Sequence, residues 1–231
     1  MLKKSVSLCL SLVLVLSLCF CLPLSTSAYQ SDGTKICSFN YFSALESKSA
    51  VVYKDSDCYT RTIVFPDPTA TNCKITNLKS NKGGVWLRNY GEYFTINTQS
   101  FTGTAKITYK FNGVSQTFKY TVKKYANPCK SFKIGSTDYA KKFNSKTSLY
   151  SFRNIKKQKL TIKANSGWII TKIETCSNRY NKNTDYNYYY PYKSSFTINN
   201  VTLFSNGQSH IYVTFKNTNN GAENTLMYFV R

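Results

Sequence analysis

The dominant pattern of the chain is an alternation of apolar and polar residues with a period of two. Residues 104–111 and 116–123 alternate in this way around an Asn-Gly turn, and residues 209–216 and 225–230 do so around an Asn- and Gly-rich turn. Such alternation is typical of a sheet with one face on a core and the other in water. The pattern therefore predicts two antiparallel hairpins, one closing each half of the chain.

Further strands are predicted along the whole chain, separated by turn residues at intervals of roughly 8 to 12 residues. They fall at residues 49–53, 59–65, 72–78, 85–88, 92–96, 131–135, 149–153, 159–163, 168–175 and 195–201. Tyr, Phe and Thr are abundant, which favours strands. Helical periodicity is absent except for a weak candidate at residues 43–49. The sequence thus predicts an all-β fold of two tandem antiparallel β-sandwiches.

The first 28 residues have the layout of a secretory signal peptide. Lys3 and Lys4 form a basic start, the apolar run Val6–Leu22 follows, and Thr26–Ala28 offers small residues for cleavage. The run is short for a membrane span, and its cysteines lack the preceding small residue of a lipidation site. We therefore expect a cleaved signal peptide at residues 1–28, with no membrane span after cleavage. The mature protein is expected to be secreted or extracellular, free or associated with the cell surface, and of bacterial origin.

The boundary between the two halves is expected after residue 127. The long alternating segment that closes the first half ends at Lys123. Pro128 follows shortly and cannot donate a backbone hydrogen bond to a strand ladder. Residues 29–127 are thus expected to form the first sandwich and residues 128–231 the second, each of the size of a small domain.

Charge narrows the classes of partner. The chain carries 31 basic and 10 acidic residues, a net charge of +21, or +19 once Lys3 and Lys4 leave with the signal peptide. A field of this sign attracts anionic polymers such as teichoic acid, acidic glycans, DNA or anionic membrane. No intracellular nucleic acid is expected as a partner, because the protein is expected to be secreted. The alternative is that the lysines only solvate outer strand faces, as the shared face of Lys106 and Lys110 suggests.

The cysteines favour disulfides over a metal centre. Of the eight in the chain, five lie beyond the signal peptide, so at least one is free or pairs with another chain. The simplest candidates for a bridge are Cys37, Cys58 and Cys73. The spacings match no zinc signature and the chain has a single histidine. No metal and no cofactor are expected.

Two segments of the first half carry a family resemblance. Residues 74–80 (KITNLKS), 102–109 (TGTAKITY) and 118–122 (FKYTV) resemble the bacterial immunoglobulin-like surface domains. Those domains end in a small-residue Gly-Thr-Ala segment before a strand, a turn and a final strand.

The second half resembles a different family, the cadherin-like β-sandwich domain of bacterial surface proteins. The resemblance lies in residues 160–164 (LTIKA), 210–214 (HIYVT), Gly221 and 228–231 (YFVR). Both resemblances imply an immunoglobulin-like fold that serves as a spacer, an adhesion module or a carbohydrate-binding accessory. Neither family has a shared catalytic set, so no functional residue is carried over.

A tyrosine-rich segment at residues 180–192 is the candidate binding site. We expect it to be a long loop between strands, because tyrosine rings offer broad contact surface at little entropic cost. The candidate ligand-binding residues are Tyr186, Tyr188, Tyr189, Tyr190 and Tyr192, with Arg179, Lys182 and Lys193 beside them. The alternative is that the tyrosines cover one end of the sandwich and bind nothing.

Catalytic residues do not stand out. His210 lies inside an alternating strand, where a histidine that faces water or packs beside Tyr212 is the ordinary expectation, and the acidic residues are scattered. Trp86 and Trp168 are expected in the core. The sequence therefore indicates a non-enzymatic protein that binds a glycan or an anionic surface polymer. A structural or protein-binding adhesion module, and a small secreted toxin or immune-evasion protein, are the alternatives.

Overall fold

The computed structural model describes residues 28–29, 35–54, 59–179 and 184–231, with side chains from residue 40 onward except residue 59. The strands of the first half are β1 (Ala28–Tyr29), β2 (Lys35–Ser43), β3 (Ser49–Tyr53), β4 (Tyr59–Phe65), β5 (Ile75–Ser80), β6 (Val85–Asn89), β7 (Phe94–Thr98), β8 (Gly103–Phe111) and β9 (Val114–Lys123). Those of the second half are β10 (Cys129–Ile134), β11 (Thr137–Asp138), β12 (Ser148–Ser151), β13 (Ile155–Ala164), β14 (Trp168–Ser177), β15 (Asp185–Tyr189), β16 (Ser195–Leu203), β17 (Ser209–Asn217) and β18 (Glu223–Val230). A short 3-10 helix, η1 (Ala140–Asn144), precedes β12.

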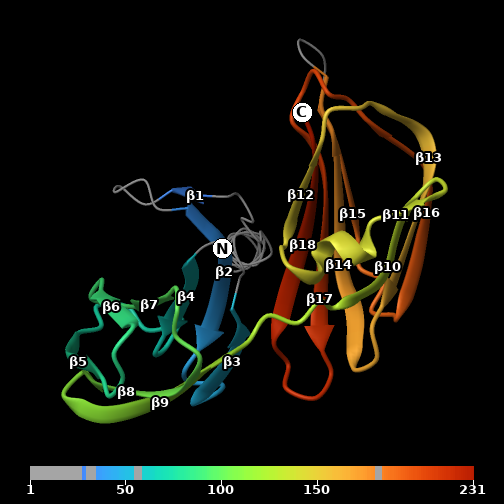
Figure 1. The fold of residues 1–231 in the computed structure, drawn as a ribbon. Coiled ribbons are helices and arrows are strands. Elements are labelled where there is room, and N and C mark those ends of the chain that lie inside the picture. Colours follow the sequence, from blue (N-terminus) through green and yellow to red (C-terminus); the bar gives the residue numbers. More distant parts are fainter. Residues whose placement is uncertain (1–27, 30–34, 55–58, 180–183) are drawn as a thin grey trace, which may run out of the picture.

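Each half is a pair of sheets packed face to face (Figure 1). In the first half the sheets have the strand orders β1-β2-β4-β7-β6 and β3-β9-β8-β5. In the second half the orders are β11-β10-β13-β16 and β12-β18-β17-β14-β15. Two layers of strands around an apolar core are a β-sandwich, so the all-β prediction is confirmed, and the architecture is immunoglobulin-like.

The sheets were expected to be purely antiparallel, but some of their strand pairs are parallel. Among the described strands β2 pairs with β4, β3 with β9, and β12 with β18 in parallel. A parallel pair needs a long connection in place of a hairpin turn. Strands β3 and β12 each lie beside the last strand of their own half, where only a crossover can place them. Alternation within a strand carries no information on such pairing.

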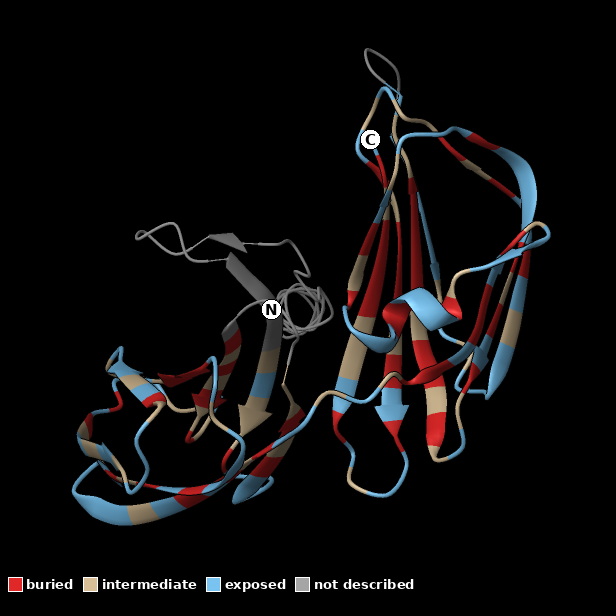
Figure 2. Ribbon diagram, viewed as in Figure 1, coloured by how far each residue is buried: buried red, intermediate tan, exposed pale blue. Residues whose placement is uncertain are grey.

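Two apolar cores lie between the sheets, where Figure 2 shows buried residues in rows along the strands. The first core includes Phe94, Ile96, Phe118 and Tyr120, and all its buried members lie within residues 44–122. The second extends over residues 129–230 and contains Trp168, as expected. Period-two alternation places these side chains on the inner faces. The domain division after residue 127 remains a prediction, and residues 1–27 of the expected signal peptide lie outside the described residues.

Most strand predictions hold, with shifts at the ends, and those at 49–53 and 59–65 match their bounds. Strand β2 is absent from the predicted set because its sequence does not alternate cleanly. The helix expected at residues 43–49 is wrong. That segment is a turn in which the Ser47 amide donates to the Ser43 carbonyl at 3.0 Å.

The two halves contact each other through a few aromatic and polar groups. The ring of Tyr53, on β3, lies 5.0 Å from that of Trp168 between centroids. The side-chain amide of Asn220 donates to the Tyr53 hydroxyl at 3.4 Å. The Tyr125 hydroxyl, in the connecting segment, donates to the Phe143 carbonyl at 2.6 Å. These contacts join the first sandwich to the end of the second.

Candidate functional site

The tyrosine-rich segment is a strand, which corrects the expectation of a loop. Residues Asp185–Tyr189 form β15, which pairs with β14 in antiparallel register at the edge of a five-stranded sheet. Tyrosine is a strong strand former, and the alternating sequence DYNYY fits a pleat. Asn187, one of the residues that suggested a loop, lies within the strand, and residues 180–183 of the segment lie outside the described residues.

The pleat divides the tyrosines between two faces. Tyr186 and Tyr188 lie on the outer face and are 53% and 45% exposed. Tyr189 points inward and packs against Phe196 and the second core, with ring centroids 5.6 Å apart. Tyr190, just beyond the strand, is exposed. The strand therefore exposes the rings of Tyr186 and Tyr188 to solvent, Tyr190 adds a third exposed ring beyond its end, and Tyr189 serves packing.

The outer side of the sheet β12-β18-β17-β14-β15 is covered with aromatic rings from edge to edge. We call this surface the outer aromatic face. It comprises Tyr150, Phe229, Tyr212, His210, Lys172, Glu174, Cys176, Tyr186 and Tyr188. Tyr150 and Phe229 stack at 5.1 Å, and the guanidinium of Arg231 lies 4.6 Å from the Tyr150 ring centre. The outer side of a sandwich sheet is usually polar, so this composition marks the face as unusual.

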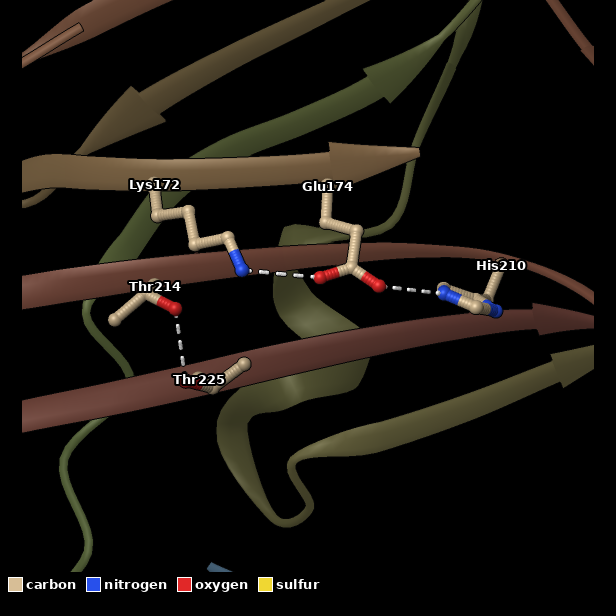
Figure 3. Close-up of polar contacts among 5 residues, drawn as sticks. All are labelled: Lys172, Glu174, His210, Thr214 and Thr225. Atoms are coloured by element: carbon tan, nitrogen blue, oxygen red, sulfur yellow. Dashed lines mark hydrogen bonds and ion pairs between the residues drawn. The ribbon is translucent and has the colours of Figure 1, made fainter. Parts of the chain in front are cut away.

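A row of three charged groups crosses the middle of this face (Figure 3). Glu174 of β14 accepts at Oε2 from the Lys172 ammonium and at Oε1 from the Nε2 of His210 on β17, both at 3.1 Å. The three side chains are only 11–12% exposed. One carboxylate thus holds two cationic groups, and the row keeps an excess positive charge when His210 is protonated.

Aromatic rings surround the row and explain its burial. The Tyr212 ring stacks on the His210 ring at 4.0 Å, and the Tyr186 ring meets it edge-on at 6.3 Å. The Lys172 ammonium lies 4.9 Å from the centre of the Tyr188 ring. Charges enclosed by low-dielectric groups interact more strongly than they do in water. The stacking of His210 on Tyr212 confirms the packing expected for this residue.

The environment of His210 favours its charged form. Burial opposes protonation, but hydrogen bonds to Cys176 and Glu174 and the negative charge of Glu174 raise the pKa of His210 to about 9. The geometry agrees, because Nε2 faces Glu174 and Nδ1 lies 3.4 Å from the Gln208 carbonyl oxygen. An imidazolium has two N–H donors, and both find oxygen acceptors here.

A thiol, an imidazole and a carboxylate meet at Cys176, His210 and Glu174, the residue types of a cysteine nucleophile site. Cys176 is 1% exposed, so no substrate reaches its sulfur in this conformation. Both nitrogens of His210 face oxygen atoms, which leaves no free lone pair as a base once the ring is protonated. The arrangement suits a fixed ionic network better than a catalytic one.

The cationic residues expected beside the tyrosines are only partly assembled with them. Arg179 lies with its guanidinium 5.4 Å from the Phe204 ring centre. Lys193 is exposed and bridges to Ile170 through the backbone. Tyr192 is exposed and has a φ of 47°. Lys182 lies outside the described residues. The lysine that does contact a tyrosine of the outer aromatic face is Lys172, which the sequence did not single out.

Two further expectations are corrected by side-chain positions. Cys73 carries a free buried thiol, so the expected bridge through it does not form. Cys129 and Cys176 also carry free buried thiols. The side chains of Cys37 and Cys58 lie outside the described residues. Trp86 was expected in the core, but it lies on edge strand β6 and is 48% exposed.

The sequence contained part of the signal for this face. Ile211 and Val213 face the core, so alternation places Tyr212, between them, on the outer face of β17. By the same alternation Lys172, Glu174 and Cys176 lie on the outer face of β14. What alternation does not supply is the register. Glu174 lies directly opposite both Tyr188 and Tyr212, and Cys176 opposite both Tyr186 and His210. Only the pairing of three strands assembles the row.

No protein family model and no curated protein matches the chain. Solved structures similar to it include a three-domain immunoglobulin fragment of titin, with 8% identity and a TM-score of 0.22, covering 78% of this chain and 61% of the fragment. An endo-fucoidan hydrolase of glycoside hydrolase family 107 has 10% identity and a TM-score of 0.25, over 88% of this chain and 29% of the hydrolase. Domains 4 and 5 of the S-layer protein SbsC have 16% identity and a TM-score of 0.20, over 69% and 70%.

The chain thus spans less than two thirds of the titin fragment and of the hydrolase. With TM-scores this low, the fold assignment rests on the strand pairing itself. Within the part of the chain that the structure describes, no helix is long and apolar enough to cross a membrane. The same residues contain no group of three or more His, Cys, Asp or Glu side chains placed to hold a metal ion.

Proposed function

We propose that the protein is a secreted, non-catalytic bacterial binding module, and that it binds an anionic glycan or surface polymer on the outer aromatic face. One observation carries the proposal. Tyr186 and Tyr188 are half-exposed and lie beside the row of three charged side chains, which aromatic rings surround. Soluble monomers rarely leave adjoining aromatic residues in solvent without a binding role. The two tyrosine rings are parallel within 5°, with centroids 6.3 Å apart.

The chemistry of the face matches a sugar. Tyrosine rings offer flat apolar surface to the C–H groups of a sugar ring and a hydroxyl for hydrogen bonding. Lys172 and protonated His210 supply positive charge at the base of the rings, and Glu174 compensates only one of the two. The surplus charge favours a ligand that carries carboxylate, phosphate or sulfate groups.

Lysines on the first sandwich extend the positive field. Lys106 and Lys119 lie directly opposite each other on the exposed side of the β8–β9 hairpin, with Lys123 on the same face of β9. Like charges placed opposite each other in a ladder repel. An anionic polymer that lies along this hairpin relieves the repulsion, which supports a long ligand with repeated negative charges.

The test is binding of the mature protein to a glycan array and to immobilised teichoic acid at physiological salt. The decisive variant is Tyr186→Ala with Tyr188→Ala, which leaves the inward Tyr189 in place. We expect at least a tenfold loss of affinity, about 1.4 kcal/mol. Phe152→Ala is the matched control, because Phe152 is 79% exposed and lies outside the outer aromatic face. Its affinity should equal that of the unmodified protein.

Two results contradict the proposal. One is the absence of binding to any anionic glycan or polymer. The other is equal affinity of the double variant and the control, which would show that charge alone drives binding. Urea unfolding of each variant must accompany the binding data, because removal of Tyr188 also removes its contact with Lys172.

Strand addition by a protein partner is the second candidate function, in line with an adhesion module. It rests on β15, which lies at the edge of its sheet and pairs with β14 among the strands that the structure describes. Unpaired backbone groups of an edge can pair with a strand of another protein. Asn187→Pro removes one backbone donor of β15. If that change abolishes binding while the tyrosine double variant does not, the partner is a protein strand.

A further inference from the structure

The outer side of the first sandwich carries a second cluster, on β4, β7 and β6. In β7, Phe94 and Ile96 belong to the core, so Thr95 and Asn97 point to the opposite face. Asn97 lies directly opposite Arg61 of β4 on one side and Trp86 of β6 on the other. A guanidinium, an amide and an indole thus form one row across three neighbouring strands.

Two atoms of this row are buried and lack a hydrogen-bond partner. They are the Nε of Arg61, a donor, and the Oδ1 of Asn97, an acceptor. Asn97 is 8% exposed, and its Nδ2 donates to the Thr95 hydroxyl at 3.5 Å. Buried polar groups are nearly always paired, so an unpaired donor and acceptor at one rung of a sheet call for an explanation.

A hydroxyl group supplies what both atoms need. It donates one hydrogen bond and accepts others, so a single hydroxyl bonds the Asn97 oxygen and the Arg61 N–H together. A carboxylate only accepts and an ammonium only donates, so neither satisfies the pair. A ligand with hydroxyl groups therefore fits the pair, as a single water molecule also does.

The surroundings narrow the ligand further. Trp86 is 48% exposed beside the pair. On the next rung Arg88 lies opposite Thr95, with its guanidinium 5.1 Å from the Tyr90 ring centre. The Tyr90 ring in turn stacks on that of Tyr93 at 4.8 Å. Aromatic surface with a cation at its margin suits a sugar that carries a negative group.

We infer that Trp86, Asn97 and Arg61 form a second carbohydrate site that takes an acidic oligosaccharide, separate from the outer aromatic face. One sugar hydroxyl lies between the Arg61 Nε and the Asn97 Oδ1, the sugar ring lies on Trp86, and a carboxylate reaches Arg88. The two sites lie on different sandwiches, so one long polymer can occupy both.

Tryptophan fluorescence reports on this site alone. The chain has two tryptophans, and Trp168 is buried in the second core. The probes are a galacturonic acid hexasaccharide and its fully methyl-esterified form, which has the same sugars and linkages without the charge. They are titrated into the mature protein that carries Tyr186→Ala and Tyr188→Ala, which removes the site of the proposed function. We expect a saturable change in fluorescence with the acidic probe and at least tenfold weaker binding of the neutral one.

Asn97→Leu separates binding from stability, since leucine has a similar size and no acceptor. We expect at least tenfold weaker binding of the acidic probe, measured by calorimetry, and a melting temperature equal to or above that of the parent. Trp86→Ala should lose binding in the same assay without unfolding, and Phe152→Ala should bind like the parent. Saturable binding that Asn97→Leu leaves unchanged overturns the site, as does no fluorescence change with either probe. A lower melting temperature with unchanged binding would mean that the pair only holds water.

Discussion

Replacing Glu174 by Gln tests the charged row of the outer aromatic face. The change keeps the size of the side chain and removes the one negative charge between Lys172 and His210. We expect the pKa of His210 to fall from about 9 toward its ordinary value near 6.5. The two cationic groups then lose their shared partner in a site that is almost closed to water.

The magnitude follows from the difference between the folded and unfolded pKa of His210. Each pH unit between the two corresponds to about 1.4 kcal/mol, so charged His210 contributes at most about 3 kcal/mol to the free energy of unfolding. Because the folded pKa is raised, this contribution is complete below about pH 6.5 and is lost as the pH rises through about 9. Above that range His210 is neutral, and the Lys172–Glu174 pair is the part of the row that stays charged.

The assay uses the fact that the chain has a single histidine. An NMR titration of its imidazole should give a midpoint near pH 9 in the unmodified protein and a clearly lower midpoint in Glu174→Gln, because the carboxylate that favours the charged ring is gone. Urea unfolding at pH 6 and pH 10 should show a difference between the two proteins of about 2–3 kcal/mol that shrinks at the higher pH. Glu46→Gln is the control, because Glu46 is exposed in a turn of the first sandwich.

A midpoint near 6.5 in the unmodified protein would refute the reasoning. So would a loss of stability that is the same at both pH values, since it would show that Glu174 acts by packing and not through the charge of His210. Measuring Cys176→Ser beside the parent separates the part of the raised pKa of His210 that comes from the neighbouring thiol from the part that comes from Glu174.

Three other substitutions test the cores and turns. Tyr120→Phe removes the buried 2.9 Å hydrogen bond between the Tyr120 and Thr62 hydroxyls and should cost about 1–2 kcal/mol in urea unfolding; an unchanged midpoint would contradict the bond. Gly207→Ala places a Cβ against the carbonyl oxygen of Asn178, and we expect a loss of about 1–3 kcal/mol in thermal unfolding, whereas unchanged stability would show that the turn adapts freely. Asp138→Asn alters a carboxylate that accepts hydrogen bonds from two backbone amides and a serine hydroxyl. Burial raises the pKa of Asp138, but these hydrogen bonds outweigh it and lower the pKa below 3.8. The unmodified protein should therefore lose stability as the pH falls through that pKa, and the variant should lose less. Identical acid unfolding curves would count against this role.

The sequence predicted most of the fold because sandwich strands carry their own signal. Residues 104–111 and 116–123 alternate so regularly that their inner and outer faces are fixed without any knowledge of their partners. Strand β2 was missed because it has no such alternation, and the tyrosine strand because asparagine suggested a loop. The parallel pairing of β3 with β9 depends on a crossover, which leaves no local trace.

The candidate site was predictable only in part. The sequence pointed to Tyr186 and Tyr188 as contact residues, and the fold adds Lys172, Glu174 and His210 beside them. It also turns Tyr189 inward, where composition had grouped it with its neighbours. A residue's face follows from its position in a strand, whereas its neighbours across the sheet follow from register, which long-range packing sets.

The sequence by itself determined the class of fold, the alternation of faces, the strong positive charge and the presence of an unusual run of tyrosines, because these are local or additive properties. The tertiary structure alone decided which strands are neighbours. It therefore also decided that the Glu174 carboxylate binds both Lys172 and His210 and that aromatic rings surround these groups. It also placed the unpaired groups of Arg61 and Asn97 beside Trp86. Residues far apart in the chain acquire joint chemistry only when strand register brings them to the same rung.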